Sequence, residues 1–405
     1  MINLPFAPPY IDDDIINAVV DTLKSGWITT GPRSKELECE LARFCDSNSV
    51  LTVNSATSGL MLALAWFGVG RGDEVIIPSY TYAATAFAVM NLGATPIMVD
   101  CKRDLCIDTT LINSLVTNRT KAIIPVDVAG LPCNYDEIKK VVESAEVIQK
   151  FHPNNHNQEK LGRLLILSDA AHSLGSSYNG APTNLQSDIS IFSFHAVKNI
   201  TAAEGGAVVC NLPKVFNNSE WYNELKLLSL NGQTKDAYSK SKSGNWKYDI
   251  VCRGYKMNLP DLCSAMALAM LKKYKSELLP RRKQICENYN SLLSNFDFYE
   301  LPILKDTFRE SSYHFYPIIL KGVTEEKRDL IISKISDLGI AVNVHYRPLP
   351  SLSFFRNQGY DVKEHPVAMS QYTREISLPV YPQLSDESVD EIVIKLNRAY
   401  EMINK

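Results

Sequence analysis

The stretch "SDISIFSFHAVKNITAAEGGAVV", residues 187–209, contains two apolar runs joined by a short connection. In the first run, "ISIFSF", apolar residues alternate as they do in a buried strand, and the second run, "GAVV", is apolar throughout. Lys198 lies in the connection between these runs, where a tight link between two core strands does not require a lysine. The position of this lysine is the first indication of a functional site.

Similar apolar runs recur along the first half of the chain and alternate with helical patterns. Strands that are apolar throughout are typical of a parallel sheet that helices cover on both faces. We therefore predict an α/β fold with a large, mostly parallel sheet. The predicted strands are residues 50–54, 74–78, 95–100, 121–128, 164–169, 189–194 and 206–210.

The pattern changes after about residue 250. A long helical stretch (259–293) is followed by a strand (313–320), a helix from residue 324, a strand (341–346) and a closing helix from residue 388. This order predicts a smaller α+β domain. A chain of 405 residues exceeds the usual size of one core, so we expect a large domain at 1–250 and a small C-terminal domain at 251–405. The polar segment 150–162 is interpreted as an exposed excursion between core elements.

Composition excludes several classes of partner. The net charge of −3 is spread along the chain without a basic cluster, so we expect neither nucleic acid nor a membrane surface as a partner. The first residues lack the charged and apolar regions of a secretory signal, and no apolar run is long enough to span a bilayer. Nine cysteines occur without a C-x-x-C pair, which favours reduced, buried thiols and no metal site. We expect a cytoplasmic protein.

Three predicted strands are followed by polar residues at the edge of the sheet where open parallel sheets bind ligands. Ser55 and Thr57 precede an apolar helix whose first N–H groups suit a phosphate, although either residue could be only a helix N-cap. Asp169 ends a strand and is followed by His172; alone, this aspartate could equally belong to a helix cap or a structural ion pair. Lys198 alone could extend to solvent or pair with Glu204.

The combination of these three strand ends is more informative than any one of them. Pyridoxal 5′-phosphate (PLP) needs a lysine for a Schiff base, a carboxylate beside its pyridine nitrogen, and donors for its phosphate. Lys198, Asp169 and the segment around Ser55 and Thr57 supply these groups, and Ser193 precedes Lys198 in a Ser-x-x-x-x-Lys arrangement. The sequence therefore predicts a PLP site.

Several motifs of this chain resemble those of the DegT/DnrJ/EryC1/StrS family of nucleotide-sugar aminotransferases. They are "NSAT" (54–57), "PSYTYAAT" (78–85), "SDAAHSLG" (168–175), "SFHAVKNITAAEGGAVV" (193–209) and "GYKMNLPDLCSAMAL" (254–268). The resemblance covers nearly the whole chain and is strongest to enzymes that aminate UDP-4-keto sugars, such as those of the 4-amino-4-deoxy-L-arabinose type. It implies the aspartate-aminotransferase fold, which is fold type I of the PLP enzymes.

The resemblance also implies roles for individual residues. Lys198 would form the Schiff base and Asp169 would contact the pyridine nitrogen. Tyr82 would lie over the cofactor ring, and His172 near its phenolic oxygen. The implied phosphate contacts are Ser55, Ala56, Thr57 and Ser193, joined by Asn258 from the other subunit of a homodimer with shared active sites; the implied sugar-side residues are Trp27, Thr29, Thr30, His314 and His345. His152, His156 and His365 match nothing and are expected at the surface.

The implied reaction is an amino transfer from L-glutamate, which becomes 2-oxoglutarate, to a nucleotide-linked keto-sugar for bacterial lipopolysaccharide or another surface polysaccharide. "KMNL" around Asn258 favours a UDP-linked 4-keto sugar. A dTDP- or GDP-linked 3- or 4-keto sugar is the alternative substrate. A sugar 3-dehydratase is disfavoured because that branch carries histidine in place of the lysine. A non-catalytic regulatory protein of the same fold is the remaining alternative, and the complete set of lysine, aspartate and phosphate donors argues against it.

Overall fold

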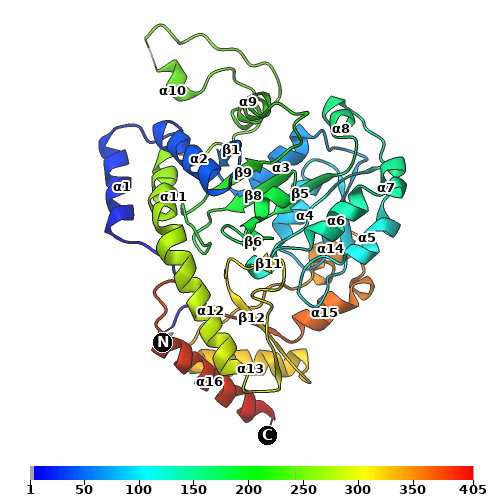
Figure 1. The fold of residues 1–405 in the computed structure, drawn as a ribbon, viewed down its shortest axis with the longest axis vertical. Coiled ribbons are helices and arrows are strands. Elements are labelled where there is room, and N and C mark those ends of the chain that lie inside the picture. The colour runs from blue at the N-terminus through cyan, green and yellow to red at the C-terminus, as the bar shows by residue number, and fades with distance from the viewer. Residues whose placement is uncertain (1–3, 242, 405) are drawn as a thin grey trace.

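The central element of the fold is a seven-stranded sheet in the order β1-β9-β8-β5-β4-β2-β3, seen in the computed structural model of residues 4–241 and 243–404 (Figure 1). All pairs from β8 to β3 are parallel, whereas β9 runs antiparallel to both of its neighbours. The expected large, mostly parallel sheet is thereby confirmed. Its strands are β1 (Ser49–Val53), β2 (Glu74–Pro78), β3 (Thr95–Val99), β4 (Thr120–Ile123), β5 (Leu165–Asp169), β8 (Ile189–Ser193) and β9 (Gly206–Cys210).

Each of the seven apolar runs forms a strand, and their ends differ from the prediction by a few residues. The largest difference is in β4, which was predicted to reach residue 128 and ends at Ile123. Pro125 follows, and because proline has no N–H it cannot donate to a sheet ladder. Its carbonyl oxygen instead accepts from the Asp169 N–H at 2.9 Å, so the chain beyond β4 stays beside the end of β5.

Helices pack on the sheet and carry most of the connections between its strands (Figure 1). They are α3 (Ala56–Trp66), α4 (Ala83–Met90), α5 (Thr109–Leu115), α6 (Tyr135–Val142), α7 (Ala145–Lys150), α8 (His156–Leu161) and α9 (Asn218–Ser229), whereas α10 (Ala237–Lys240) lies on a segment that extends away from the sheet. β2 is buried over its whole length, as its apolar sequence predicts.

Segment 150–162 differs from the expected exposed excursion because part of it is anchored. Helix α8 forms within it, and Gln158 is completely buried. The Gln158 side chain donates to the Phe67 carbonyl oxygen at 2.9 Å, and Asn155 donates to the same oxygen at 3.1 Å. Amide side chains of this polar segment thus bind the C-terminal end of α3, which the amino-acid composition alone does not reveal.

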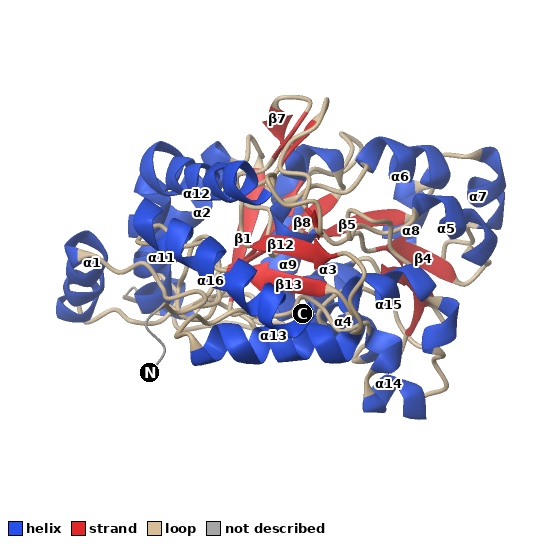
Figure 2. Cartoon of the chain, turned by 90° about the horizontal axis from the view of Figure 1, so that it is seen from below, coloured by secondary structure: helices blue, strands red, loops and turns tan. Residues whose placement is uncertain are grey.

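A second core lies below the sheet in Figure 1 and is built around a three-stranded sheet in the order β10-β12-β13. Its strands are β10 (Tyr299–Glu300), β12 (Tyr316–Leu320) and β13 (Glu375–Leu378), and its helices are α12 (Leu279–Leu293), α13 (Glu325–Asp337) and α16 (Asp386–Asn404). Figure 2 shows β12 and β13 side by side, with α13 and α16 beside them.

The predicted strand 341–346 is wrong. Within this segment only Asn343 forms an isolated bridge, to Ser377 of β13, and β13 itself was not predicted. The segment cannot extend the pairing because it turns towards the large sheet, where Leu349 N–H donates to the Ser79 carbonyl oxygen. This turn brings residues 344–346 to the edge of the large sheet.

The N-terminal helices pack against the long helical stretch that was predicted at 259–293. Helices α1 (Asp13–Lys24), α2 (Pro32–Phe44) and α11 (Asp261–Lys273) share a core that contains Ile15, Leu37 and Leu268. A π-helix, Tyr274–Leu278, joins α11 to α12. α11 packs on the N-terminal helices, and α12 belongs to the second core. The domain boundary at residue 250 stays a prediction.

The remaining elements are short. They are β6 (Ser177–Tyr178), β7 (Ala181–Pro182), β11 (Arg309–Glu310), α14 (Ser353–Asn357), α15 (Pro366–Tyr372) and the 3-10 turns Val128–Gly130, Thr183–Gln186, Leu349–Ser351 and Val362–Glu364. Strands β11, β6 and β7 form a small third sheet. No helix among the described residues is long and apolar enough to cross a membrane.

Candidate active site

A cavity of about 500 Å³ lies at the carboxyl ends of the parallel strands. Segments that follow β1, β2, β5 and β8 form most of its wall, and residues 345–346 close one side. The predicted site residues that line it are Ser55, Ala56, Thr57, Tyr82, Asp169, His172, Ser193, Lys198 and His345. The fold thus brings together residues from five separate parts of the chain.

Lys198 lies in the connection between β8 and β9. This connection is held by backbone hydrogen bonds, including Phe194 N–H to the Gly205 carbonyl oxygen at 2.8 Å and Ala202 N–H to the Phe194 carbonyl oxygen at 2.8 Å. Within the described residues, Lys198 Nζ makes no hydrogen bond or ion pair, and Glu204 lies near His195 instead. Burial lowers the pKa of Lys198 to about 8, and the negative charge of Asp169 opposes this effect only in part. The cavity therefore holds an amine that is easily deprotonated.

Asp169 ends β5 and is held in place by two donors. Thr85 Oγ1 donates to Asp169 Oδ2 at 2.8 Å, and Ala171 N–H donates to Oδ1 at 3.3 Å. Burial raises the pKa of Asp169, while the Thr85 and Ala171 hydrogen bonds and the positive charge of Lys198 lower it. A cationic ring nitrogen beside Asp169 would offset the cost of burying this carboxylate.

The first turn of α3 forms a cradle with unused donors. Ser55 is the N-cap of α3, because its hydroxyl accepts from Ser58 N–H at 3.1 Å, so the capping interpretation of this residue is correct. The N–H groups of Ala56 and Thr57 have no acceptor among the described residues, and neither does the Thr57 hydroxyl. Ser193 lies in the same wall. Free N–H groups at a helix N-terminus beside hydroxyls suit a phosphate.

Gly206 lets β9 pass close to this cradle. A Cβ atom at Gly206 would lie 2.8 Å from the Ala56 nitrogen and 2.7 Å from the Phe192 carbonyl oxygen. Any larger residue would push the start of α3 away from the end of β8. The glycine therefore keeps the cradle and Lys198 in one cavity.

Two aromatic residues and a histidine form the wall opposite the sheet. Tyr82 is 64% exposed, and its ring centroid lies 6.2 Å from that of Tyr346. The Tyr346 hydroxyl lies 3.0 Å from His172 Nε2, while His172 Nδ1 is buried without a hydrogen-bond partner among the described residues. Burial lowers the pKa of His172, so its imidazole is neutral near pH 7.

Five predicted residues do not line this cavity. His314 stacks on His172 at 4.5 Å, and its Nδ1 lies 2.9 Å from Asn199 Oδ1, so it is a neighbour of the wall. Asn258 donates to Thr30 Oγ1 at 2.5 Å. Trp27 Nε1 donates to the Thr30 carbonyl oxygen, and Thr29 is exposed. Hydrogen bonds thus connect Trp27, Thr30 and Asn258 outside the cavity, and with Thr29, adjacent in the chain, these residues are called the surface cluster.

Two site residues were missed from the sequence, and one histidine was misplaced. Thr85 is the hydroxyl partner of Asp169, and Tyr346 closes the cavity next to Tyr82. Thr85 is three residues beyond Tyr82 in "TYAAT", so a helix beginning at Ala83 could have suggested that it points to the same place. His365, expected at the surface, is buried, whereas His152 and His156 are exposed as expected.

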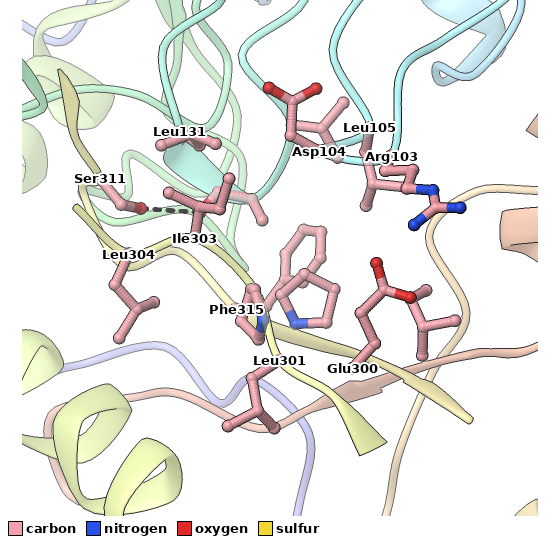
Figure 3. A pocket seen from close by; sticks show the side chains of 15 residues that line it. Arg103, Asp104, Leu105, Leu131, Glu300, Leu301, Ile303, Leu304, Ser311 and Phe315 are labelled. Carbon is pink, nitrogen blue, oxygen red and sulfur yellow. Dashed lines mark hydrogen bonds between the residues drawn. The ribbon is translucent and has the colours of Figure 1, made fainter. Parts of the chain in front are cut away.

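A second cavity of about 100 Å³ lies between the large sheet and the second core, and it is not a candidate for this chemistry. Figure 3 shows Arg103 and Glu300 at one end of it, while its wall is mostly apolar and includes Leu131 and Phe315. Its aspartate, Asp104, is already paired with Arg309 at 2.9 Å. The volume is below that of ordinary cofactor sites. Among the described residues, no cluster could hold a metal ion.

The fold and the cavity define a class of protein, the PLP-dependent enzymes of fold type I. Known proteins agree: the sequence matches the DegT/DnrJ/EryC1/StrS aminotransferase family over residues 9–149 and 156–397. The chain belongs to this family, which confirms the resemblance, and it is a PLP-dependent sugar aminotransferase. The matched ranges omit residues 150–155, the first part of the polar segment.

Individual relatives cover almost the entire chain. A putative sugar aminotransferase of Streptococcus pneumoniae, Spr1654 in its pyridoxamine-phosphate form, is 43% identical with a TM-score of 0.95, over 99% of this chain and 100% of that one. PseC of Helicobacter pylori, an aminotransferase of pseudoaminic acid biosynthesis, is 30% identical with a TM-score of 0.84, over 98% and 99% of the two chains. SpsC of Bacillus subtilis, a spore coat polysaccharide biosynthesis protein, is 33% identical over 96% and 95%.

Proposed function

We propose that the enzyme transfers the amino group of L-glutamate to a UDP-linked 4-keto sugar, for the synthesis of a bacterial surface glycan. The observation that carries the amino transfer is the convergence of Lys198, Asp169 and the α3 cradle on one cavity. The similarity to PseC and SpsC supports a sugar acceptor, because both relatives are named for the biosynthesis of a sugar or a polysaccharide. The nucleotide, the keto position and the donor rest on the motif resemblance.

Within this proposal, Lys198 and Asp169 are the catalytic residues. PLP, when bound, supplies an electron-accepting ring that stabilises negative charge at the carbon from which a proton is lost. Lys198 would hold the cofactor covalently, and its Nζ, once free, would accept and return the proton that the substrate carbon loses. The pKa of about 8 suits this role, because the amine can both accept and return a proton near neutral pH. Asp169 would hold the ring nitrogen in its protonated form.

The remaining cavity residues position the cofactor. Ala56 and Thr57 would donate their free N–H groups, and Thr57 and Ser193 their hydroxyls, to its phosphate. Tyr82 would cover one face of the ring. His172 would contact the phenolic oxygen, and its buried Nδ1 still lacks a partner among the described residues. The orphaned donors thus fit a phosphorylated aromatic cofactor.

The sugar site is proposed at the open side of the cavity, near His345 and with His314 behind the wall. A 4-keto carbon suits this geometry, because C4 is the ring carbon farthest from the anomeric diphosphate. The anionic nucleotide can then stay outside while C4 reaches Lys198. A 3-keto sugar, or a dTDP or GDP carrier, is the alternative acceptor.

A homodimer with shared active sites would account for the surface cluster of Trp27, Thr29, Thr30 and Asn258. In this arrangement Asn258 would reach the phosphate in the partner's cavity, and Trp27 would line the partner's sugar side. Mixing Lys198→Ala chains with inactive Asn258→Asp chains should then restore one site in each heterodimer. A mixture that remains inactive would argue against the shared site.

The proposal is tested by offering UDP-, dTDP- and GDP-linked 3-keto and 4-keto sugars with glutamate. Mass spectrometry of the sugar and measurement of 2-oxoglutarate should show one amino sugar for each oxo-acid formed. We expect the UDP-linked 4-keto sugar to be preferred. Preference for a 3-keto or dTDP-linked sugar would refute the substrate, and purified protein that never binds PLP would instead support the regulatory alternative.

A further inference from the structure

We propose that Glu375 and Ser377 are positioning residues that determine which nitrogen of His345 carries the hydrogen, and thereby whether Nε2 donates or accepts a hydrogen bond towards the sugar. This inference rests on the proposed function, in which His345 lies on the sugar side of the cavity. Both positioning residues belong to β13, the strand that the sequence pattern did not reveal.

The imidazole of His345 is held on three sides. Its ring stacks on the Phe315 ring, with the two centroids 4.4 Å apart. It also stacks on the Phe6 ring, with the centroids 5.5 Å apart. Nδ1 lies 2.8 Å from Ser377 Oγ. Among the described residues, Nε2 has only a long contact of 3.4 Å, with Asn343 Nδ2. Nε2 is therefore the polar atom of this ring that a substrate in the cavity can use.

The Ser377 hydroxyl connects His345 to a buried carboxyl group. Ser377 Oγ lies 2.5 Å from Glu375 Oε1, and both residues are completely buried. Glu375 Oε2 accepts from the backbone N–H of His345 at 2.9 Å, which fixes the orientation of the carboxyl group. Because residues 375 and 377 are two apart in a strand, their side chains share one face of β13. Glu375, Ser377 and His345 thus form one hydrogen-bonded chain.

The number of hydrogens on this chain decides the state of Nε2. When Glu375 is neutral, its Oε1–H donates to Ser377, the Ser377 hydroxyl donates to Nδ1, and the ring hydrogen resides on Nε2, which becomes a donor. When Glu375 is ionised, Ser377 donates to the carboxylate and accepts from Nδ1–H, which leaves Nε2 bare as an acceptor. In each state every hydrogen between Glu375, Ser377 and Nδ1 lies between one donor and one acceptor.

The charges around Glu375 favour its neutral form at pH 7. The positive charge of Arg328 of α13 acts on Glu375, but the Arg328 Nε is paired with Asp329, and its Nη1 donates to the backbone carbonyl oxygen of Glu375. The Tyr80 hydroxyl, from the segment after β2, donates to the His345 carbonyl oxygen at 2.6 Å and not to the carboxyl group. Burial without a paired cation raises the pKa of Glu375 to about 8.

The groups that face His345 from the cavity keep its ring neutral. Burial and the positive charge of Lys198 lower the pKa of His345 to about 3, and Tyr82, His172 and Tyr346 are the other titratable groups in this wall. Because His345 is already neutral, titration of Glu375 cannot change the charge of the ring. It can change only which ring nitrogen carries the hydrogen. At pH 7 Nε2 therefore donates to the sugar, and above about pH 8 it becomes an acceptor.

Two substitutions separate a positioning role from a merely structural one. Glu375→Gln places an amide NH₂ where Oε1–H stands, so it still donates to Ser377 but cannot ionise. The His345 hydrogen should then stay on Nε2 at every pH. Ser377→Ala removes the connecting hydroxyl, and Ser377→Thr restores it with one additional methyl group.

The deciding experiment is solid-state ¹⁵N NMR of the PLP-loaded enzyme with ¹⁵N-labelled histidine. The chain has 7 histidines, and a His345→Gln sample identifies the His345 signal by difference. We expect Nε2–H at about pH 6.5 and Nδ1–H at about pH 9.5 in the wild type, on either side of the Glu375 pKa. Glu375→Gln should show Nε2–H at both pH values, and Ser377→Ala should lose the switch while Ser377→Thr keeps it.

One tautomer at both pH values in the wild type would overturn the inference, and so would an unaltered switch in Glu375→Gln. Kinetics then separate this inference from the proposed function. At pH 7, Ser377→Ala should slow the reaction of the aminated enzyme with the keto-sugar about tenfold and change the glutamate half-reaction less than about twofold, while Glu375→Gln stays near wild type. Equal loss in both half-reactions would also overturn the inference. A wild type that aminates no sugar would refute the proposed function and leave the NMR result standing.

Discussion

The two walls of the cavity are built by different means. On the sheet wall, Asp169 and Ser193 end strands that are paired along their whole length, so backbone hydrogen bonds fix their positions. On the opposite wall, His345 follows a single backbone bridge and is held by side chains, namely the Tyr80 hydroxyl and the Glu375 carboxyl group.

This difference suggests that the sheet wall holds the cofactor and that the opposite wall contacts the sugar. A wall fixed by a sheet ladder suits a cofactor that stays in one place through both halves of a reaction. A wall fixed by side chains can be altered residue by residue without disturbing the sheet. We therefore expect changes in the sheet wall to affect both half-reactions, and changes around His345 to affect the sugar half-reaction alone.

The largest effect is expected for Lys198→Ala in the sheet wall. Loss of the amine removes both the covalent attachment and the proton transfer, so turnover should fall by about 10⁴-fold or more. PLP should still bind through the α3 cradle. Steady-state kinetics and the visible spectrum provide the measurement, with the exposed Lys214→Ala as control. Substantial turnover in Lys198→Ala would show that another residue moves the proton.

Asp169→Asn should follow, with a fall of about 10²-fold or more in kcat for both half-reactions. The amide keeps the shape of the side chain and the donor from Thr85, but it has no charge to hold the ring nitrogen protonated. Stopped-flow absorbance with glutamate alone and with the sugar alone would measure each half. The exposed Asp21→Asn is a matched control. A loss confined to the sugar half-reaction would contradict the division between the two walls.

A pH dependence of cofactor attachment is expected next. Only the neutral amine reacts, and burial lowers the pKa of Lys198 from 10.5 to about 8. The rate at which PLP attaches to the apoenzyme should therefore rise about tenfold per pH unit below pH 8 and then level off. Stopped-flow absorbance after mixing with PLP measures this rate. A rise that continues to about pH 10 would mean that Lys198 is not shifted.

The smallest effect is expected for Thr85→Val, which removes the hydroxyl donor to Asp169 and keeps the shape. The pKa of Asp169 should rise further, and kcat should fall about tenfold in both half-reactions. Thr22→Val on α1 is a buried control, since within the described part of the chain the Thr22 hydroxyl bonds only to the Ala18 carbonyl oxygen. A slower sugar half-reaction with an unchanged glutamate half-reaction would show that Thr85 does not act through Asp169 in the sheet wall.

The sheet wall was also the part that could be predicted from the sequence. Apolar runs such as "LLILSD" and "ISIFSF" identify buried strands, and Asp169 and Lys198 follow from where those strands end. The reversed direction of β9 could not be predicted, because "GAVVC" is equally apolar in either orientation. Thr85 was missed because a threonine in the first turn of a helix is common and its bond to Asp169 spans 84 residues.

The opposite wall could not be predicted from the sequence, for a different reason. "AVNVHY" has the alternation of a strand, but its backbone leaves the small sheet after one bridge, and the four-residue β13 takes its place beside β12. Glu375 in "REISLP" gives no sign in the sequence that it is buried, since its carboxyl group is accommodated by Ser377 and by a backbone N–H of a distant segment. Contacts of this kind depend on tertiary packing.

In the proposed mechanism, the sheet wall holds PLP on Lys198. Reduction of the enzyme with borohydride should fix the cofactor covalently, and chymotryptic digestion followed by mass spectrometry should then locate it. We predict that the label is found on a peptide that contains Lys198 and that the Lys198→Ala enzyme yields no labelled peptide. A label on any other lysine, with Lys198 unmodified, would contradict it.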